Sequence, residues 1–154
     1  SVEENREKRY RIEDAVRSGK SAVQEGIVPG GGMALFRASE VVEKVASKEL
    51  DLGKRTGLLI LANAIKSPAK QIIDNAWKNG DVVLDRILRD GKDNPSYGYN
   101  SATGEYGDLI EQGVIDPAMV VRVALENAVS VVSMFLRTDA VIADEPEEKE
   151  EEGE

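Results

Sequence analysis

Three consecutive glycines, Gly30, Gly31 and Gly32, constrain the fold of this chain more than any other feature. Pro29 precedes them and cannot continue an incoming helix, and three residues without Cβ atoms allow positive φ and a close approach. Apolar spacing resumes at Met33, so this glycine loop (residues 30–32) ends at the N-terminus of a helix. Free amides at the positive end of a helix dipole suit an anion or a nucleotide. A tight turn between two helices is the competing interpretation, and for glycines alone it is the commoner one.

The chain contains neither cysteine nor histidine. This composition excludes a disulfide framework, a Ser-His or Cys-His nucleophile and a metal site built on histidine. Any chemistry must therefore rest on carboxylates and on the backbone. We find no signal-peptide pattern at the N-terminus and no apolar run of bilayer length, so we expect a cytoplasmic protein without a membrane partner.

The formal charge of −9 is concentrated near the C-terminus. Residues 144–154 carry eight acids and one lysine, a net charge of −7, which leaves −2 for residues 1–143. A nearly neutral body lacks the basic stripe that nucleic acid requires, so we expect no nucleic-acid partner. The acidic tail cannot form a core, and we expect it to be disordered.

Helical spacing of apolar residues predicts that the N-terminal half of the chain is built from helices. A long first helix should run over residues 9–27, and a second from Met33 to near Ser47. Either Ser47 or Asp51 should cap the third. Residues 58–65 are apolar nearly all round, so we expect the third helix to be the buried centre of the domain.

Turn residues end the third helix and separate two shorter ones. Pro68 suits the first turn of a fourth helix, which should run over residues 69–77. Asp81 then resembles an N-cap for a fifth helix over residues 82–89. Five helices in succession indicate one mainly α domain, a size that 154 residues can support.

The remaining third of the chain mixes short strands with one long helix. Residues 97–101 and 105–108 are aromatic and rich in glycine, which predicts a small hairpin. Residues 139–143 are typical of an edge strand, and we expect its partner to come from outside this chain.

The last long helix should run over residues 118–137. Asp116 and Pro117 precede it and match an N-cap acid followed by a proline at the first helical position. Because its apolar residues recur at helical spacing, we expect this helix to pack on the third.

Asp14 falls within the apolar stripe of the first helix, where a carboxylate is unfavourable unless it is paired or used. Arg9, Arg11 and Arg17 lie close to it along the helix. On spacing alone, a surface ion pair with one of them is the preferred interpretation.

Four motifs follow one another in a diagnostic order: RIEDA at residues 11–15, EGIVPGGG at 25–32, YGYNSATGEYG at 97–107 and GVIDP at 113–117. In this order they resemble the C-terminal part of a group I chaperonin, the GroEL family, over residues 5 to 143. The resemblance implies a mainly α fold, a helical bundle like the chaperonin equatorial domain, with a small β-hairpin and a C-terminal edge strand.

The resemblance also implies a division of the chain. Residues 1–25 would be the intermediate-domain helix running into the equatorial domain, and residues 26–143 the C-terminal half of that ATP-binding domain. Residues 144–154 remain a disordered acidic tail. The family's phosphate loop with its magnesium-binding Asp has no Gly-Asp-Gly-Thr counterpart here, and the apical domain is also missing. We therefore expect this chain alone to be inactive.

By resemblance, one residue is catalytic and seven contact ATP or ADP. Asp14 would position the attacking water, which replaces the ion-pair interpretation of this residue. Gly31 would lie against the ribose, Asp116 would accept hydrogen bonds from its hydroxyls, and Val114 would pack on the base. Asn100 begins the segment that touches adenine, with an amide that offers a donor and an acceptor. The ATP-binding residues are Gly31, Gly32, Asn100, Ser101, Ala102, Val114 and Asp116, and no metal ligand is assigned.

The function implied by the resemblance is ATP-dependent protein folding. Mg²⁺ and K⁺ would be bound mainly by the missing N-terminal half. The partners would be further copies of the subunit in a double ring, unfolded client proteins and a co-chaperonin. The alternative is an autonomous, non-catalytic helical interaction module whose acidic tail binds a basic partner. Because the first helix has no cap and the predicted edge strand has no partner in this chain, we favour the interpretation that the chain is a fragment of a chaperonin subunit.

Overall fold

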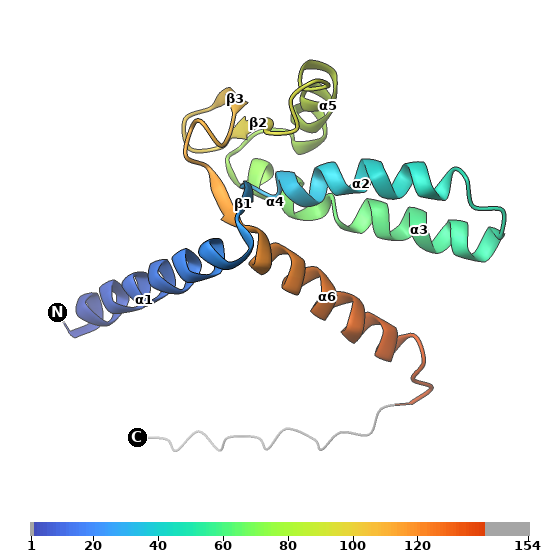
Figure 1. The fold of residues 1–154 in the computed structure, drawn as a ribbon, viewed down its shortest axis with the longest axis horizontal. Coiled ribbons are helices and arrows are strands. Elements are labelled where there is room, and N and C mark those ends of the chain that lie inside the picture. Colours follow the sequence, from blue (N-terminus) through green and yellow to red (C-terminus); the bar gives the residue numbers. More distant parts are fainter. Residues whose placement is uncertain (1, 141–154) are drawn as a thin grey trace, which may run out of the picture.

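The computed structural model describes residues 2–140, and Figure 1 shows them as helices with two small antiparallel sheets. Every predicted helix and the predicted hairpin are present, and most ends agree within a few residues, but the first helix begins at Val2 and not at the predicted residue 9. The elements are α1 Val2–Glu25, β1 Ile27–Pro29, α2 Met33–Ala46, α3 Leu52–Ala64, α4 Ser67–Asn75, α5 Gly80–Asp90, β2 Tyr97–Asn100, β3 Glu105–Asp108, β4 Ile115–Pro117 and α6 Ala118–Phe135.

One sheet joins distant parts of the chain and the other is local. β1 pairs with β4, so Ile27 belongs to a strand and not to the first helix as predicted. β2 and β3 form the predicted hairpin. The predicted edge strand at residues 139–143 lies mostly outside the described residues, as does the acidic tail, and residues 139 and 140 are not in a strand.

The core lies between α2, α4, α5 and the hairpin, in the upper middle of the molecule in Figure 1. Side chains from these elements exclude water from one another, which stabilises their arrangement. The buried cluster consists of Met33, Phe36, Ala69, Ile73, Val83, Leu84, Ile87, Tyr99 and Leu109.

α3 is not the buried centre that its sequence predicts. Only Ala62 is buried within the helix, while the side chains of Leu59 and Ile60 are 42% and 65% exposed. α3 lies alongside α2 in a projecting helical hairpin, and α2 covers only one of its sides (Figure 1). Because α3 is apolar nearly all round and only one side is covered, it has an exposed apolar face.

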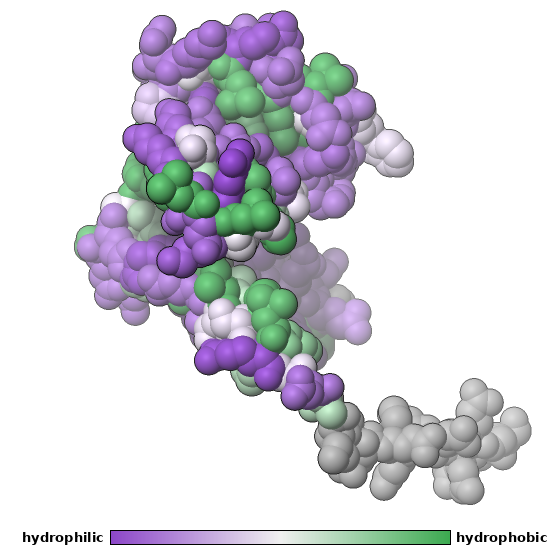
Figure 2. All heavy atoms as spheres, turned by 90° about the vertical axis from the view of Figure 1, so that its right-hand side faces the viewer, coloured by the Kyte–Doolittle hydropathy of each residue, from purple (hydrophilic) through white to green (hydrophobic). Residues whose placement is uncertain are grey.

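α6 packs against α1 and β4, so the prediction that it packs on the third helix is wrong. None of its residues is buried, and Figure 2 shows hydrophobic side chains along the lower part of the molecule, above the grey tail. By length and composition alone α6 could cross a membrane, a test that core helices of soluble proteins also pass. The expectation that no apolar run reaches this length was therefore wrong.

Side-chain caps explain two of the helix starts. Asp51 accepts a hydrogen bond from a backbone N–H three residues on, at 2.8 Å, so it caps α3, and of the two predicted candidates Ser47 is not the cap. Asn79 caps α5 in the same way at 3.1 Å, which makes the prediction for Asp81 wrong. Asp81 instead pairs with Lys70 of α4 at 2.5 Å and ties the two helices together.

Candidate functional site

The glycine loop is held against the start of α6 by the β1–β4 ladder. Val28 pairs with Asp116, and the N–H of Gly30 donates to the carbonyl of Val114 at 2.9 Å. A Cβ on Gly30 would lie 3.1 Å from the backbone of Val114, so this approach favours glycine. The ladder and this hydrogen bond thus bring the start of the glycine loop next to residues 114–116, which are distant in the sequence.

The other two glycines of the loop serve different purposes. Both have positive φ, 64° at Gly31 and 77° at Gly32. A Cβ on Gly32 would lie 2.6 Å from the backbone nitrogen of Ala69, so Gly32 allows α2 and α4 to pack closely. A Cβ on Gly31 would meet nothing within 4 Å. Gly32 therefore fits the turn interpretation, whereas Gly31 borders open space.

Asp116 is a partly buried carboxylate without a partner. It forms no hydrogen bond or ion pair with any of residues 2–140, and burial raises the pKa of its carboxyl group. The predicted N-cap role is wrong, because Asp116 belongs to β4 and Pro117 occupies the cap position without a side-chain hydrogen bond. Its carboxylate oxygens are left free to accept hydrogen bonds from a ligand.

Residues 100–102 lie in the turn of the β2–β3 hairpin. The Oδ1 atom of Asn100 accepts hydrogen bonds from the N–H groups of Ala102 at 3.1 Å and Thr103 at 3.4 Å. This use of Oδ1 leaves the Asn100 NH₂ group as the free donor of the amide. The hydroxyl of Ser101 is buried without a hydrogen-bond partner in the described part of the chain. No hydrogen bond between described residues joins this turn to the glycine loop.

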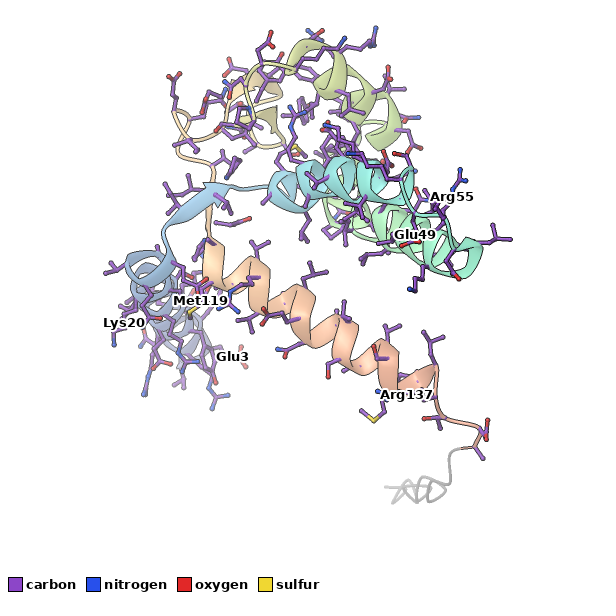
Figure 3. The ribbon with its side chains drawn as sticks, turned by 45° about the vertical axis from the view of Figure 1, so that its right-hand side comes forward. Glu3, Lys20, Glu49, Arg55, Met119 and Arg137 are labelled. Atoms are coloured by element: carbon purple, nitrogen blue, oxygen red, sulfur yellow. The ribbon has the colours of Figure 1, made fainter. Side chains whose placement is uncertain are left out.

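Asp14 stands far from the glycine loop on an exposed stretch of α1. Arg9 bonds Glu13 at 2.9 Å and Arg11 pairs with Glu7, so within residues 2–140 no ion pair to Asp14 forms. Nor does Asp14 lie in a buried stripe, because it is exposed and α1 buries none of its residues. Figure 3 shows Met119, at the start of α6, beside α1. Twelve residues along a helix place it about 18 Å from Gly26. The structure does not bring Asp14 to the other predicted site residues.

An ion pair that the sequence did not reveal fixes α1 to α6. Arg122 donates to both carboxylate oxygens of Glu25, at 2.5 and 3.1 Å, and also bonds Glu126 at 2.9 Å. The hydrogen bonds from Arg122 lower the pKa of Glu25. Glu25 is the last residue of α1, so the pair joins the C-terminal end of this helix to α6. Residues this far apart share no local pattern from which the contact could be predicted.

No group of three or more acidic residues able to hold a metal ion occurs between residues 2 and 140.

The family model of the TCP-1/cpn60 chaperonin family matches residues 2–146. Among solved structures, a chain described as the crystal structure of a group III chaperonin in the open state is 32% identical. It superposes with a TM-score of 0.73 over 79% of this chain, which in turn covers 25% of that chain. The chain thus spans a quarter of the length of the solved relative. The expected equatorial-domain-like fold is confirmed, while the assignment to group I stays a prediction.

Proposed function

Because the chain belongs to the TCP-1/cpn60 chaperonin family, whose members are ATPases, we propose that it is the C-terminal part of an ATP-dependent protein-folding subunit. It would supply the ribose and base contacts of a nucleotide site. The phosphate and magnesium contacts would come from the rest of the subunit. The chain would then bind and orient the nucleotide without completing the site.

A single observation carries this proposal. The β1–β4 ladder pairs Val28, three residues before Gly31, with Asp116, whose partly buried carboxylate forms no bond with the described residues, and a Cβ on Gly31 would meet nothing within 4 Å. Burying such a group is unfavourable in the absence of a partner. A ribose has two neighbouring hydroxyl donors, which a carboxylate can accept, and a backbone without Cβ atoms allows the sugar to lie close.

The other predicted contacts would be made with the base of the nucleotide. Val114 offers an apolar surface for the base, and the free NH₂ group of Asn100 a donor for its edge, with Ser101 and Ala102 in the same turn. Bound Mg²⁺ would neutralise the phosphates during transfer. In this proposal, Mg²⁺ and K⁺ are held mainly by residues outside this chain.

We further propose that Asp14 orients the attacking water after α1 swings toward the nucleotide. Gly26 joins α1 to β1 with a φ of 82°, and a Cβ there would meet nothing within 4 Å. Glycine tolerates a wide range of φ, so the chain can change direction at this residue. The swing would break the Glu25–Arg122 ion pair and the hydrogen bond from the Ala118 N–H to the Gly26 carbonyl. A carboxylate brought to the γ-phosphate could accept a hydrogen bond from the water and hold it in line.

Membership of the family implies ring oligomers and client proteins in general. The finer features belong to the proposal: a homo-oligomeric double ring, a co-chaperonin and a cytoplasmic location.

The proposal is tested by substituting the glycine loop in the complete subunit. Gly31→Val should weaken ADP binding strongly, because the side chain fills the space assigned to the ribose. Gly31→Asn should do the same with less strain, since Asn tolerates positive φ. Isothermal titration measures the affinity and thermal melting measures the stability of each variant.

Gly32→Ala provides the matched control. Its new methyl group would meet the backbone of Ala69, so we expect a lower melting temperature with a smaller effect on affinity. If both Gly31 variants bound ADP as tightly as the wild type, the loop would be an ordinary turn and the proposed site would be wrong.

A further inference from the structure

Arg37 links α2 to the end of α5 and to β2, the first strand of the hairpin. Its Nη1 atom donates to the Glu40 carboxylate at 3.0 Å within α2. Its Nη2 atom donates to the carbonyl of Gly91, just after α5, at 3.0 Å and to the carbonyl of Tyr97 in β2 at 3.3 Å. The side chain is 17% exposed, so these bonds are shielded from water. One guanidinium group therefore joins three elements.

The packing around Arg37 leaves little freedom for the hairpin base. A Cβ on Gly91 would lie 2.6 Å from both Nη2 of Arg37 and the ring of Tyr97. A Cβ on Gly98 would lie 2.9 Å from the side chain of Met33, the first residue of α2. The base of the hairpin thus rests on the first two turns of the helix that begins at the glycine loop.

The Arg37 side chain also carries an unfavourable feature. Its Nε atom is buried and forms no hydrogen bond with the described residues. A buried donor without a partner opposes folding, and an apolar side chain of similar length would fill the same space without that cost. What only the arginine fork supplies is simultaneous, directed bonding to Glu40 and to two carbonyls. This geometry indicates a need for fixed orientation rather than for stability.

We propose that Arg37 is a positioning residue for nucleotide binding, holding the hairpin turn at residues 100–102 at a set distance from the glycine loop. Arg37 touches no ligand itself. It acts through Tyr97, at the start of the strand that ends at Asn100, while the helix that carries Arg37 starts beside Gly31. The inference rests on the proposed nucleotide site and specifies how its base-binding and ribose-binding parts are kept together.

The experiment compares two ligands in the complete subunit, ATP and ribose 5-triphosphate, which lacks the base. Arg37→Met should weaken ATP binding about tenfold, the size expected from losing one hydrogen bond to a charged group. Binding of ribose 5-triphosphate should not change, because this ligand does not use the hairpin. Arg37→Lys, which can reach one carbonyl but not both, should give an intermediate loss.

Lys66→Met is the matched control. Lys66 pairs with Glu43 of α2 at 2.5 Å and is also partly buried, but it ties α2 to the start of α4 and not to the hairpin. This variant should lose thermal stability without changing the ratio of the two affinities. If Arg37→Met does not fold, Gly91→Ala perturbs the same bonds from the other side and must show the same ligand selectivity.

The outcomes separate this inference from the proposed function. A wild-type subunit that binds neither ligand would contradict the nucleotide site itself. The positioning role alone would be contradicted if the wild type binds both ligands and Arg37→Met keeps its full ATP affinity. It would also be contradicted if Arg37→Met loses affinity for both ligands equally. Gly91→Ala takes the place of Arg37→Met in this comparison if the latter does not fold.

Discussion

Asp116 illustrates how a single residue can be unfavourable for folding and useful for binding. Its carboxyl pKa is raised above the ordinary value of 3.8 by burial, with no compensating hydrogen bond from the described residues. The folded state therefore binds a proton more tightly than the unfolded state does. As pH rises from 3.8 through the folded pKa, the free energy of unfolding should fall, since the charged form is poorly solvated.

Asp116→Asn should consequently stabilise the ligand-free protein at neutral pH. The gain should shrink as the pH is lowered through the window in which Asp116 becomes protonated. The same variant should bind ADP more weakly, because an amide accepts fewer hydrogen bonds from the ribose than a carboxylate does. Melting curves and ADP titrations at several pH values measure both effects. A less stable variant at pH 7 would contradict the assignment of Asp116 as an unpartnered acid.

For Asp14, we expect a substitution to affect ATP hydrolysis and not ATP binding. In the complete subunit, Asp14→Ala should slow ATP hydrolysis by orders of magnitude while ATP still binds, because orienting water acts on the transition state more than on the ground state. The isolated chain should hydrolyse ATP no faster than background with or without this substitution. Steady-state turnover and equilibrium binding provide the test. Equal losses of binding and turnover would indicate a structural role.

At the scale of elements, local pattern predicted the helices better than it predicted their partners. Apolar spacing together with turn residues located all six helices, and Asp51 was one of the two predicted candidates for the cap of α3. The same spacing could not show that α6 lies on α1, because periodicity reports which face is apolar and not what covers it. The short strands β1 and β4 were not predicted, because three residues are too few to show an alternating pattern. They are recognised as strands only from their pairing with each other in the structure.

The α1–α6 contact should depend on the Glu25–Arg122 pair. Glu25→Gln should broaden the distribution of distances between spin labels at Lys8 on α1 and Val129 on α6. In the wild type, the pair contributes above the ordinary Glu25 pKa of 4.5 and is lost as pH falls through the lowered folded pKa. Pulsed electron resonance measures the distances.

Glu13→Gln is the control for this prediction, because the Arg9–Glu13 pair lies within α1 and does not involve α6. If Glu13→Gln broadened the distances as much as Glu25→Gln, the ion pair with Arg122 would not be the link between the two helices.

At the scale of the whole molecule, two helices present apolar faces that no other described element covers. Val132 and Phe135 of α6 are 54% and 68% exposed, and α3 exposes Ile60. The extent of this surface is unusual for a monomeric protein and is an association hazard. The buried core is confined to α2, α4, α5 and the hairpin.

The isolated chain should therefore self-associate through α6. Sedimentation velocity should show a size that increases with concentration, and Val132→Glu with Phe135→Lys should shift it toward the monomer. Val82→Glu, at a single exposed position of α5, should leave the association unchanged. Concentration-independent monomers of the wild type would contradict this expectation.

Amide hydrogen exchange should distinguish the helices of the buried core from the uncovered helices α3 and α6. Amides of α2, α4 and α5 should be protected more than those of residues 58–65 and 120–135. Strong protection of residues 120–135 in a proven monomer would show that α6 is covered in solution.

The helices, the hairpin and the glycine loop could be predicted from the amino-acid sequence alone, and four ordered motifs indicated the family. These features depend on neighbours in the chain, where φ preferences, caps and periodicity act over a few residues. The folded chain was needed to show that Gly32 allows close packing against Ala69 while Gly31 faces open space, and that Asp116 pairs with Val28 in a strand while its carboxylate has no partner among the described residues. It also showed that Arg37 and Arg122 join distant elements. Contacts between residues far apart in sequence leave no local pattern, because their formation depends on which surfaces meet when the whole chain folds.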